Sequence, residues 1–74
     1  MKIYVAKTLA EYRSTSTCNV KLSTSREEIE KCAKNEADVY ADTYFGTVKH
    51  PNDSKYVVYG DGITVTVTIE EHEV

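Results

Sequence analysis

Two cysteines and two histidines, Cys18, Cys32, His50 and His72, carry most of the chemistry that this 74-residue sequence could perform. A cysteine nucleophile needs a base held beside it. Both thiols fall on apolar faces of a predicted strand and helix, where cysteine behaves as an inert small hydrophobe. His50 falls in a predicted turn and His72 in the terminal tail. We therefore expect no Cys–His site and no enzyme activity.

The same four residues are poorly spaced for a metal or a crosslink. Structural zinc sites bring their ligands in close pairs such as Cys-x-x-Cys, and the sequence has no such pair. Two cysteines are too few for a disulfide scaffold, and a reducing cytosol favours free thiols over a Cys18–Cys32 bond. We expect no zinc site and no cofactor.

Carboxylates and glycines offer no better catalytic arrangement. The acids gather on the outer face of a predicted helix and in the tail, where water keeps them ionised, whereas acid–base pairs need a cleft. Phosphate-binding glycines precede a helix, but Gly60-Asp61-Gly62 lies between two predicted strands and is typical of a hairpin turn.

Length and composition indicate one small domain spanning residues 1–74. The chain is 41% hydrophobic and 28% charged, as is usual for globular proteins. No stretch approaches 18 apolar residues, and residues 1–7 lack the apolar core of a signal peptide. We expect a cytoplasmic protein that does not enter the membrane.

The strongest local pattern predicts a helix over residues 26–41. Ser25 and Glu28 have the spacing of a capping box, in which each side chain accepts from the other residue's amide. Apolar residues then recur at helical spacing: Ile29, Cys32, Ala33, Ala37, Tyr40 and Ala41. The opposite face carries two pairs at i,i+4 spacing, Glu27–Lys31 and Glu30–Lys34.

Alternating patterns predict strands on both sides of the helix. Residues 2–7 form the first, which could extend to Tyr12, and residues 14–16 form a polar turn. In residues 17–22, Cys18, Val20 and Leu22 alternate with polar residues, which predicts a half-buried strand with these three toward the core.

The C-terminal half predicts two or three further strands. Residues 44–49 and 55–59 suit short strands with a turn at 50–53, and residues 63–69 alternate strictly between aliphatic and threonine positions. Residues 71–74 form an exposed tail that frays. The fold class is α+β: an antiparallel sheet of four to five strands, in the order ββαββ or ββαβββ, with one amphipathic helix on one face.

One helix covers only one face of such a sheet, so the other face is a candidate binding surface. By strand parity this open face would display Tyr4, Tyr59, Thr64, Thr66 and Thr68. Tyrosine is common at protein interfaces, although tyrosine and threonine also suit exposed strands for structural reasons alone.

The net charge of −3 hides an uneven distribution. Residues 1–26 hold five basic residues and one acid, whereas residues 27–74 hold four basic residues and eleven acids. Neighbouring basic and acidic strands could neutralise one another, which is the simpler interpretation. Alternatively, the acidic part attracts a charged partner.

We expect a small acidic protein-binding module with a basic, nucleic-acid-handling partner. The acidic positions assigned to this role are Glu27, Glu30, Asp38, Glu70, Glu71 and Glu73. In size, acidity and absence of a catalytic set the chain resembles small accessory proteins of phages and mobile elements, of which anti-CRISPR inhibitors are one group. The resemblance implies a stoichiometric inhibitor of a host CRISPR-type complex.

Two other functions compete with this hypothesis. A homodimer could form through the open face or an edge strand, and a chain this small gains stability from such pairing. Direct nucleic-acid binding would use Lys2, Lys7, Arg13 and Lys21 with Tyr4 or Tyr12 as a stacking group. The overall acidity makes direct nucleic-acid binding the less favoured of the two.

Overall fold

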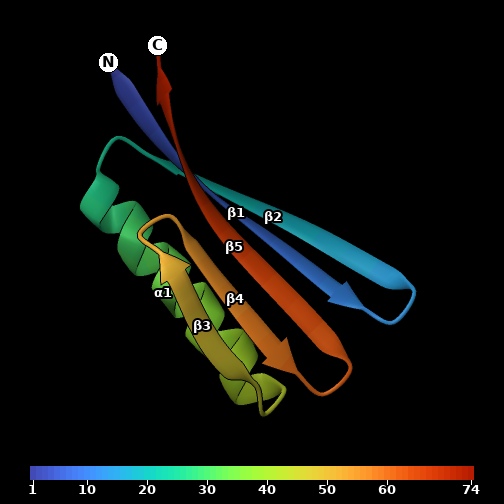
Figure 1. Ribbon diagram of the computed structural model, residues 1–74. Coiled ribbons are helices and arrows are strands. Elements are labelled where there is room, and N and C mark those ends of the chain that lie inside the picture. Colours follow the sequence, from blue (N-terminus) through green and yellow to red (C-terminus); the bar gives the residue numbers. More distant parts are fainter.

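Five antiparallel strands form one sheet, and a single helix lies across one face of it, in the computed structural model, which describes residues 1–74 (Figure 1). The elements in chain order are β1 (Lys2–Tyr12), β2 (Thr15–Ser23), α1 (Arg26–Thr43), β3 (Thr47–Asn52), β4 (Lys55–Gly60) and β5 (Ile63–Glu73). The strands are ordered β2-β1-β5-β4-β3 across the sheet. The predicted α+β class is confirmed, in its ββαβββ form.

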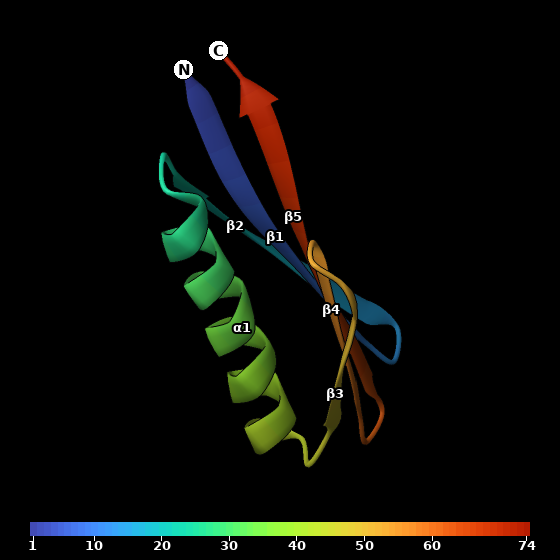
Figure 2. The same ribbon diagram turned by 60° about the vertical axis from the view of Figure 1, so that its left-hand side comes forward.

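The hydrophobic core lies between α1 and the central strands. Its sheet side consists of Ala6, Ala10, Val58, Ile63, Val65, Val67 and Ile69. The helix contributes Ile29, Ala33 and Ala37, all buried. Because two of these three are alanines, the helix axis can approach the sheet closely, as its narrow apolar stripe predicts. Figure 2 shows α1 running along one side of the sheet with nothing on the other side.

The start of α1 differs in detail from the predicted capping box. The Ser25 hydroxyl accepts from the Glu28 amide at 3.3 Å, as expected. The Ser25 amide, however, donates to the Ser23 hydroxyl at 3.0 Å, and that hydroxyl donates to the Glu28 carboxylate at 3.2 Å. The Ser23 hydroxyl thus lies between the Ser25 amide and the Glu28 carboxylate in place of a direct bond. The amides of Ser25 and Glu28 both still have an acceptor.

Strand β2 faces the opposite way from the prediction. Cys18, Val20 and Leu22 lie opposite Leu9, Lys7 and Val5 of β1, on the sheet face away from the helix. All three are exposed, as is the whole of β2 up to Ser23. The reason is the two-residue turn after Tyr12, which pairs even residues of β1 with odd residues of β2.

Two strand boundaries also differ from the prediction. The C-terminal tail does not fray: residues 71–73 pair with Tyr4, Ile3 and Lys2 and extend β5 to Glu73, so both termini lie together (Figure 1). Pro51, predicted in a turn, lies within β3. It is tolerated because β3 is an edge strand and its register with β4 shifts between Lys49 and Asn52.

Candidate protein-binding surfaces

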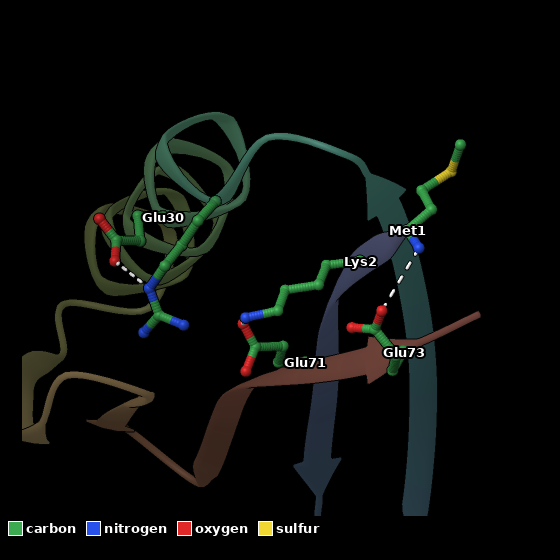
Figure 3. Close-up of polar contacts among 6 residues, drawn as sticks. Met1, Lys2, Glu30, Glu71 and Glu73 are labelled. Carbon is green, nitrogen blue, oxygen red and sulfur yellow. Dashed lines mark hydrogen bonds and ion pairs between the residues drawn. The ribbon is translucent and has the colours of Figure 1, made fainter.

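The acids of β5 are paired with bases of β1 and with the amino terminus. Glu71 lies 3.4 Å from the Lys2 ammonium, and Glu73 lies 3.3 Å from the amino group of Met1 (Figure 3). These contacts arise because β1 and β5 are neighbours across the central ladder. Predicted neutralisation between basic and acidic strands is therefore observed at this end of the sheet.

A third pair lies on the open face of the same ladder. The Lys7 Nζ is 2.6 Å from Glu70 Oε2, an oxygen shielded from solvent that has no other polar partner. Hydrogen bonding to Lys7 lowers the pKa of Glu70, and hydrogen bonding to Glu70 raises the pKa of Lys7. Lys2 and Lys7 are consequently both engaged, which leaves Arg13 and Lys21 as the unpaired bases of the N-terminal hairpin.

The first half of α1 is neutralised as well. Glu27 lies 3.6 Å from Lys31, as its spacing predicts. Glu30 pairs with Arg26, with its Oε1 2.8 Å from Nε, and not with Lys34 as expected (Figure 3). Five of the six acidic positions assigned to partner binding thus have a basic neighbour within the chain. Asp38 is the exception.

Asp38 and Asp42 form an unneutralised pair in the second half of α1. They are four residues apart, so two like charges lie on one side of the helix, and neither takes part in an ion pair. Asp42 also lies in the last turn, at the negative end of the helix dipole, and that turn holds no basic residue that would offset it. Both placements disfavour the helix locally.

The chain leaves α1 through a conformation that its sequence does not favour. Tyr44 is the C-cap, and Phe45 follows with φ of 53°, in the left-handed region that glycine usually occupies after a helix. The Gly46 amide donates to the Ala41 carbonyl at 2.8 Å, as in a Schellman motif. Phe45 is also 94% exposed, the most exposed large apolar residue of the chain.

Gly46 explains why Phe45 takes this position. A Cβ on Gly46 would come within 3.0 Å of the Tyr59 carbonyl oxygen and of Val58 Cγ1, so the backbone here passes tightly against β4. The glycine is required for this close approach, one position after the left-handed residue. The backbone on both sides of Phe45 is held in place, while its side chain extends into solvent.

Three tyrosine rings lie together beside the loop that follows α1. The rings of Tyr40 and Tyr44 are nearly parallel with centroids 6.2 Å apart, and Tyr12 lies 6.1 Å from Tyr44. Arg13, at a φ of 55° in the β1–β2 turn, lies 5.3 Å from the Tyr12 ring. The two non-glycine residues with positive φ thus belong to one end of the molecule.

We define the α1 C-terminal surface as Asp38, Val39, Asp42 and Phe45. Val39 contributes a second exposed apolar side chain. Sequence reasoning assigned only Asp38 to partner binding. The available signals were the Asp-x-x-x-Asp spacing and a phenylalanine directly before the glycine at a helix end.

The open sheet face holds most of the residues predicted for it. Thr64, Thr66 and Thr68 lie there beside Lys7 and Glu70, and Tyr59 is 56% exposed. Tyr4 does not: it packs against the core on the helix side. The predicted parity of β1 was correct, with Tyr4 opposite to Ile3 and Val5, but the face assigned to Tyr4 was wrong because Ala6 and Ala10 share its side.

Other kinds of site are not formed. The structure has no pocket, and no three metal-ligating side chains come together. Cys18 and Cys32 are free thiols, and Cys18 is exposed and not buried as predicted. No helix combines the length and the apolarity needed to cross a bilayer. Comparisons with protein-family models, curated proteins and solved structures find no match to the chain.

Proposed function

We propose that the chain is a protein-binding module of the cytoplasm that engages a basic partner through the α1 C-terminal surface. The observation that carries this proposal is Phe45, an aromatic side chain that is almost fully exposed on a backbone position suited to glycine. Left-handed backbone costs a non-glycine residue about 1–2 kcal/mol. The Phe45 side chain, which is almost fully exposed, gains no packing within the chain that would offset this cost.

Three features that destabilise the fold locally occur within eight residues. Asp38 and Asp42 repel each other, Asp42 opposes the helix dipole, and Phe45 is exposed in a strained conformation. Proteins retain such local conflicts mainly at functional sites. A partner with an apolar pocket beside basic side chains would offset all three, because the pocket buries the ring and the bases neutralise the aspartates.

A nucleic-acid-handling complex provides such a basic surface. An acidic module that occupies it competes with the phosphate backbone for the same charges. This chemistry, with the resemblance in size and acidity to anti-CRISPR proteins, supports a stoichiometric inhibitor of a CRISPR-type complex. Titration of the chain into such a complex, with target DNA binding as the readout, should show loss of binding at an equimolar ratio.

Matched variants test the surface directly. Phe45→Gly should weaken partner capture by about 30-fold, because loss of an interface hot spot costs about 2 kcal/mol or more. It should not destabilise the fold, since glycine suits the left-handed position. Asp38→Lys should weaken capture as well, whereas Glu27→Lys, the same charge change at the neutralised end of α1, should have little effect.

The measurement is affinity capture with mass spectrometry, followed by binding isotherms with the captured partner. Thermal unfolding of each variant, followed by circular dichroism, verifies that it is folded. Equal affinity of Phe45→Gly and the unaltered chain would contradict the proposal, as would equal effects of Asp38→Lys and Glu27→Lys.

A further inference from the structure

The two edges of the sheet are protected to very different degrees. Edge strand β3 is six residues long, contains Pro51, and has an irregular register with its neighbour. Edge strand β2 is nine residues long, contains no proline, and pairs with β1 without a shift from Tyr4↔Ser23 to Tyr12↔Thr15. Short length, proline and bulges are the usual means of preventing edge association, and β2 has none of them.

Most of strand β2 also lies away from the helix. Figure 1 shows the β1–β2 hairpin projecting away from α1, and every residue of β2 before Ser23 is exposed. The edge is therefore approachable from the side without displacement of another element. Lys21 is its only charged residue. A single lysine is a weak barrier to pairing.

Val20 identifies which backbone groups of β2 point away from β1. Its amide donates to the side-chain oxygen of Asn19 at 3.1 Å and so points away from β1. Residues of an antiparallel strand direct their amide and carbonyl alternately to one neighbour and to the other. The outward-directed residues are consequently Ser16, Cys18, Val20 and Leu22.

These same residues place their side chains on the open face. Val20 is 50% exposed and Leu22 is 68% exposed, and Leu9 of β1 adds a further exposed aliphatic group beside them. The most apolar part of the open face therefore directly borders the unprotected edge. A strand added to β2 would shield both the outward-directed amides and the flanks of these side chains, with the Val20 amide exchanging its bond to the Asn19 side chain for one to the added strand.

We propose that two copies of the chain pair antiparallel through β2, about a two-fold axis at Asn19, and form one continuous ten-stranded sheet. This register overlaps all nine residues of both strands. It places outward-directed residues opposite one another, Cys18 against the partner's Val20 and Ser16 against the partner's Leu22, which gives about eight backbone hydrogen bonds.

Charge supports the same register and a second copy as the occupant. With the axis at Asn19, Lys21 lies opposite the partner's Thr17, so the two lysines are kept apart. An axis at Lys21 would oppose like charges, and an axis at Val20 would shorten the overlap. Strand β2 is thus complementary to a second copy of itself, and no strand of different sequence is needed as its partner. Its pairing is independent of the α1 C-terminal surface, which lies on other elements.

Cysteine crosslinking tests the edge and the register together. In a background of Cys18→Ser and Cys32→Ser, Asn19→Cys places the two thiols at the axis in a non-hydrogen-bonded pair, whose Cα separation of about 4.5 Å permits a disulfide. Oxidation should yield a covalent dimer about tenfold faster or more than Lys49→Cys on the β3 edge. It should also be faster than Val20→Cys.

Equal rates for Asn19→Cys and Lys49→Cys would overturn the pairing, because random collision treats both edges alike. A faster reaction at Val20→Cys would overturn the Asn19 register. Each variant is verified as folded by its thermal unfolding before oxidation.

A proline variant tests the same edge without a crosslink. Val20→Pro removes an amide that points away from β1, so the β1–β2 ladder keeps its own bonds. The dimer dissociation constant from sedimentation equilibrium should rise about tenfold or more, since symmetry removes the bond twice. Val20→Thr keeps the amide and should leave the constant nearly unchanged. A strict monomer of the unaltered chain at millimolar concentration would overturn the proposal.

Discussion

The two faces of the central β1–β5 ladder differ more than any other two regions of the molecule. On the covered face, Val65 and Val67 meet α1 and are fully buried. On the open face, the intervening Thr66 and Thr68 are half-buried and lie beside the Lys7–Glu70 pair. The alternation along β5 is the cause, because successive side chains of a strand point to opposite faces.

This difference separates two roles within one strand. The covered face holds small and branched apolar side chains against alanines of the helix, so it has little tolerance for a change in volume or polarity. Thr66 has no packed layer above it and is half-buried, so it tolerates such changes better than Val65 does. Stability therefore depends on the covered face, while the open face and the β2 edge beside it are free to contact other molecules.

The largest predicted effect comes from placing an aspartate on one face of β5 and comparing it with an aspartate on the other face. Val65→Asp buries a carboxylate with no basic partner, which costs several kcal/mol, comparable to the whole stability of about 4–11 kcal/mol expected for 74 residues. We expect this variant to lack a cooperative thermal transition. The adjacent Thr66→Asp should unfold cooperatively, destabilised by no more than about 1 kcal/mol.

Circular dichroism during heating measures both variants. If Val65→Asp and Thr66→Asp lost similar stability, the helix would not seal one face in preference to the other, and the faces would not differ as described.

Strand periodicity in the sequence was sufficient to predict the covered face of β5. Ile63, Val65, Val67 and Ile69 have no other regular period, and their burial is confirmed. The helix was predicted equally well, since Ile29, Ala33 and Ala37 recur at helical spacing and Ser25 provides a cap. These elements could be predicted because each has one strongly apolar side that must be buried.

The face of β2 could not be read from its own alternation. Cys18, Val20 and Leu22 form an apolar side, but hairpin register is set by turn length. The two-residue turn at Arg13–Ser14 aligns Ala6 with Lys21 and Val5 with Leu22. Because α1 covers the alanine side of β1, the apolar side of β2 is left in water.

Partner-binding residues were the least predictable part of the chain. The sequence shows the number of acids but not their neighbours, and five of the six assigned acids turn out to be paired. Phe45 was missed because its conformation depends on how closely Gly46 approaches β4, which is a tertiary contact.

A smaller effect is expected from a change of volume on the helix. Ala37→Leu forces a larger side chain into the contact with the sheet and should lower the free energy of unfolding by about 1–3 kcal/mol. Val39→Leu, two residues later on the solvent side of α1, should change it by no more than about 0.5 kcal/mol. Urea denaturation resolves the two values, and equal losses would show that α1 does not pack closely.

The smallest effect concerns the ion pair of the open face and depends on pH. Because Lys7 lowers the pKa of Glu70 from its usual 4.5, the pair stabilises the fold fully above pH 4.5. This stabilisation is lost as the pH falls through the lowered pKa. The raised pKa of Lys7 has the opposite sign, with stabilisation present below 10.5 and lost as the pH rises past the folded value.

Lys7→Gln removes the pair while leaving the covered face intact. The Glu70 carboxyl, followed by carbon NMR, should titrate below 4.5 in the unaltered chain and move back toward 4.5 in Lys7→Gln. The stability difference between the two chains should shrink as the pH falls from 7 to 3, because protonated Glu70 no longer attracts Lys7. A difference independent of pH would mean that Lys7 acts on the open face by packing along β1 and not by its charge.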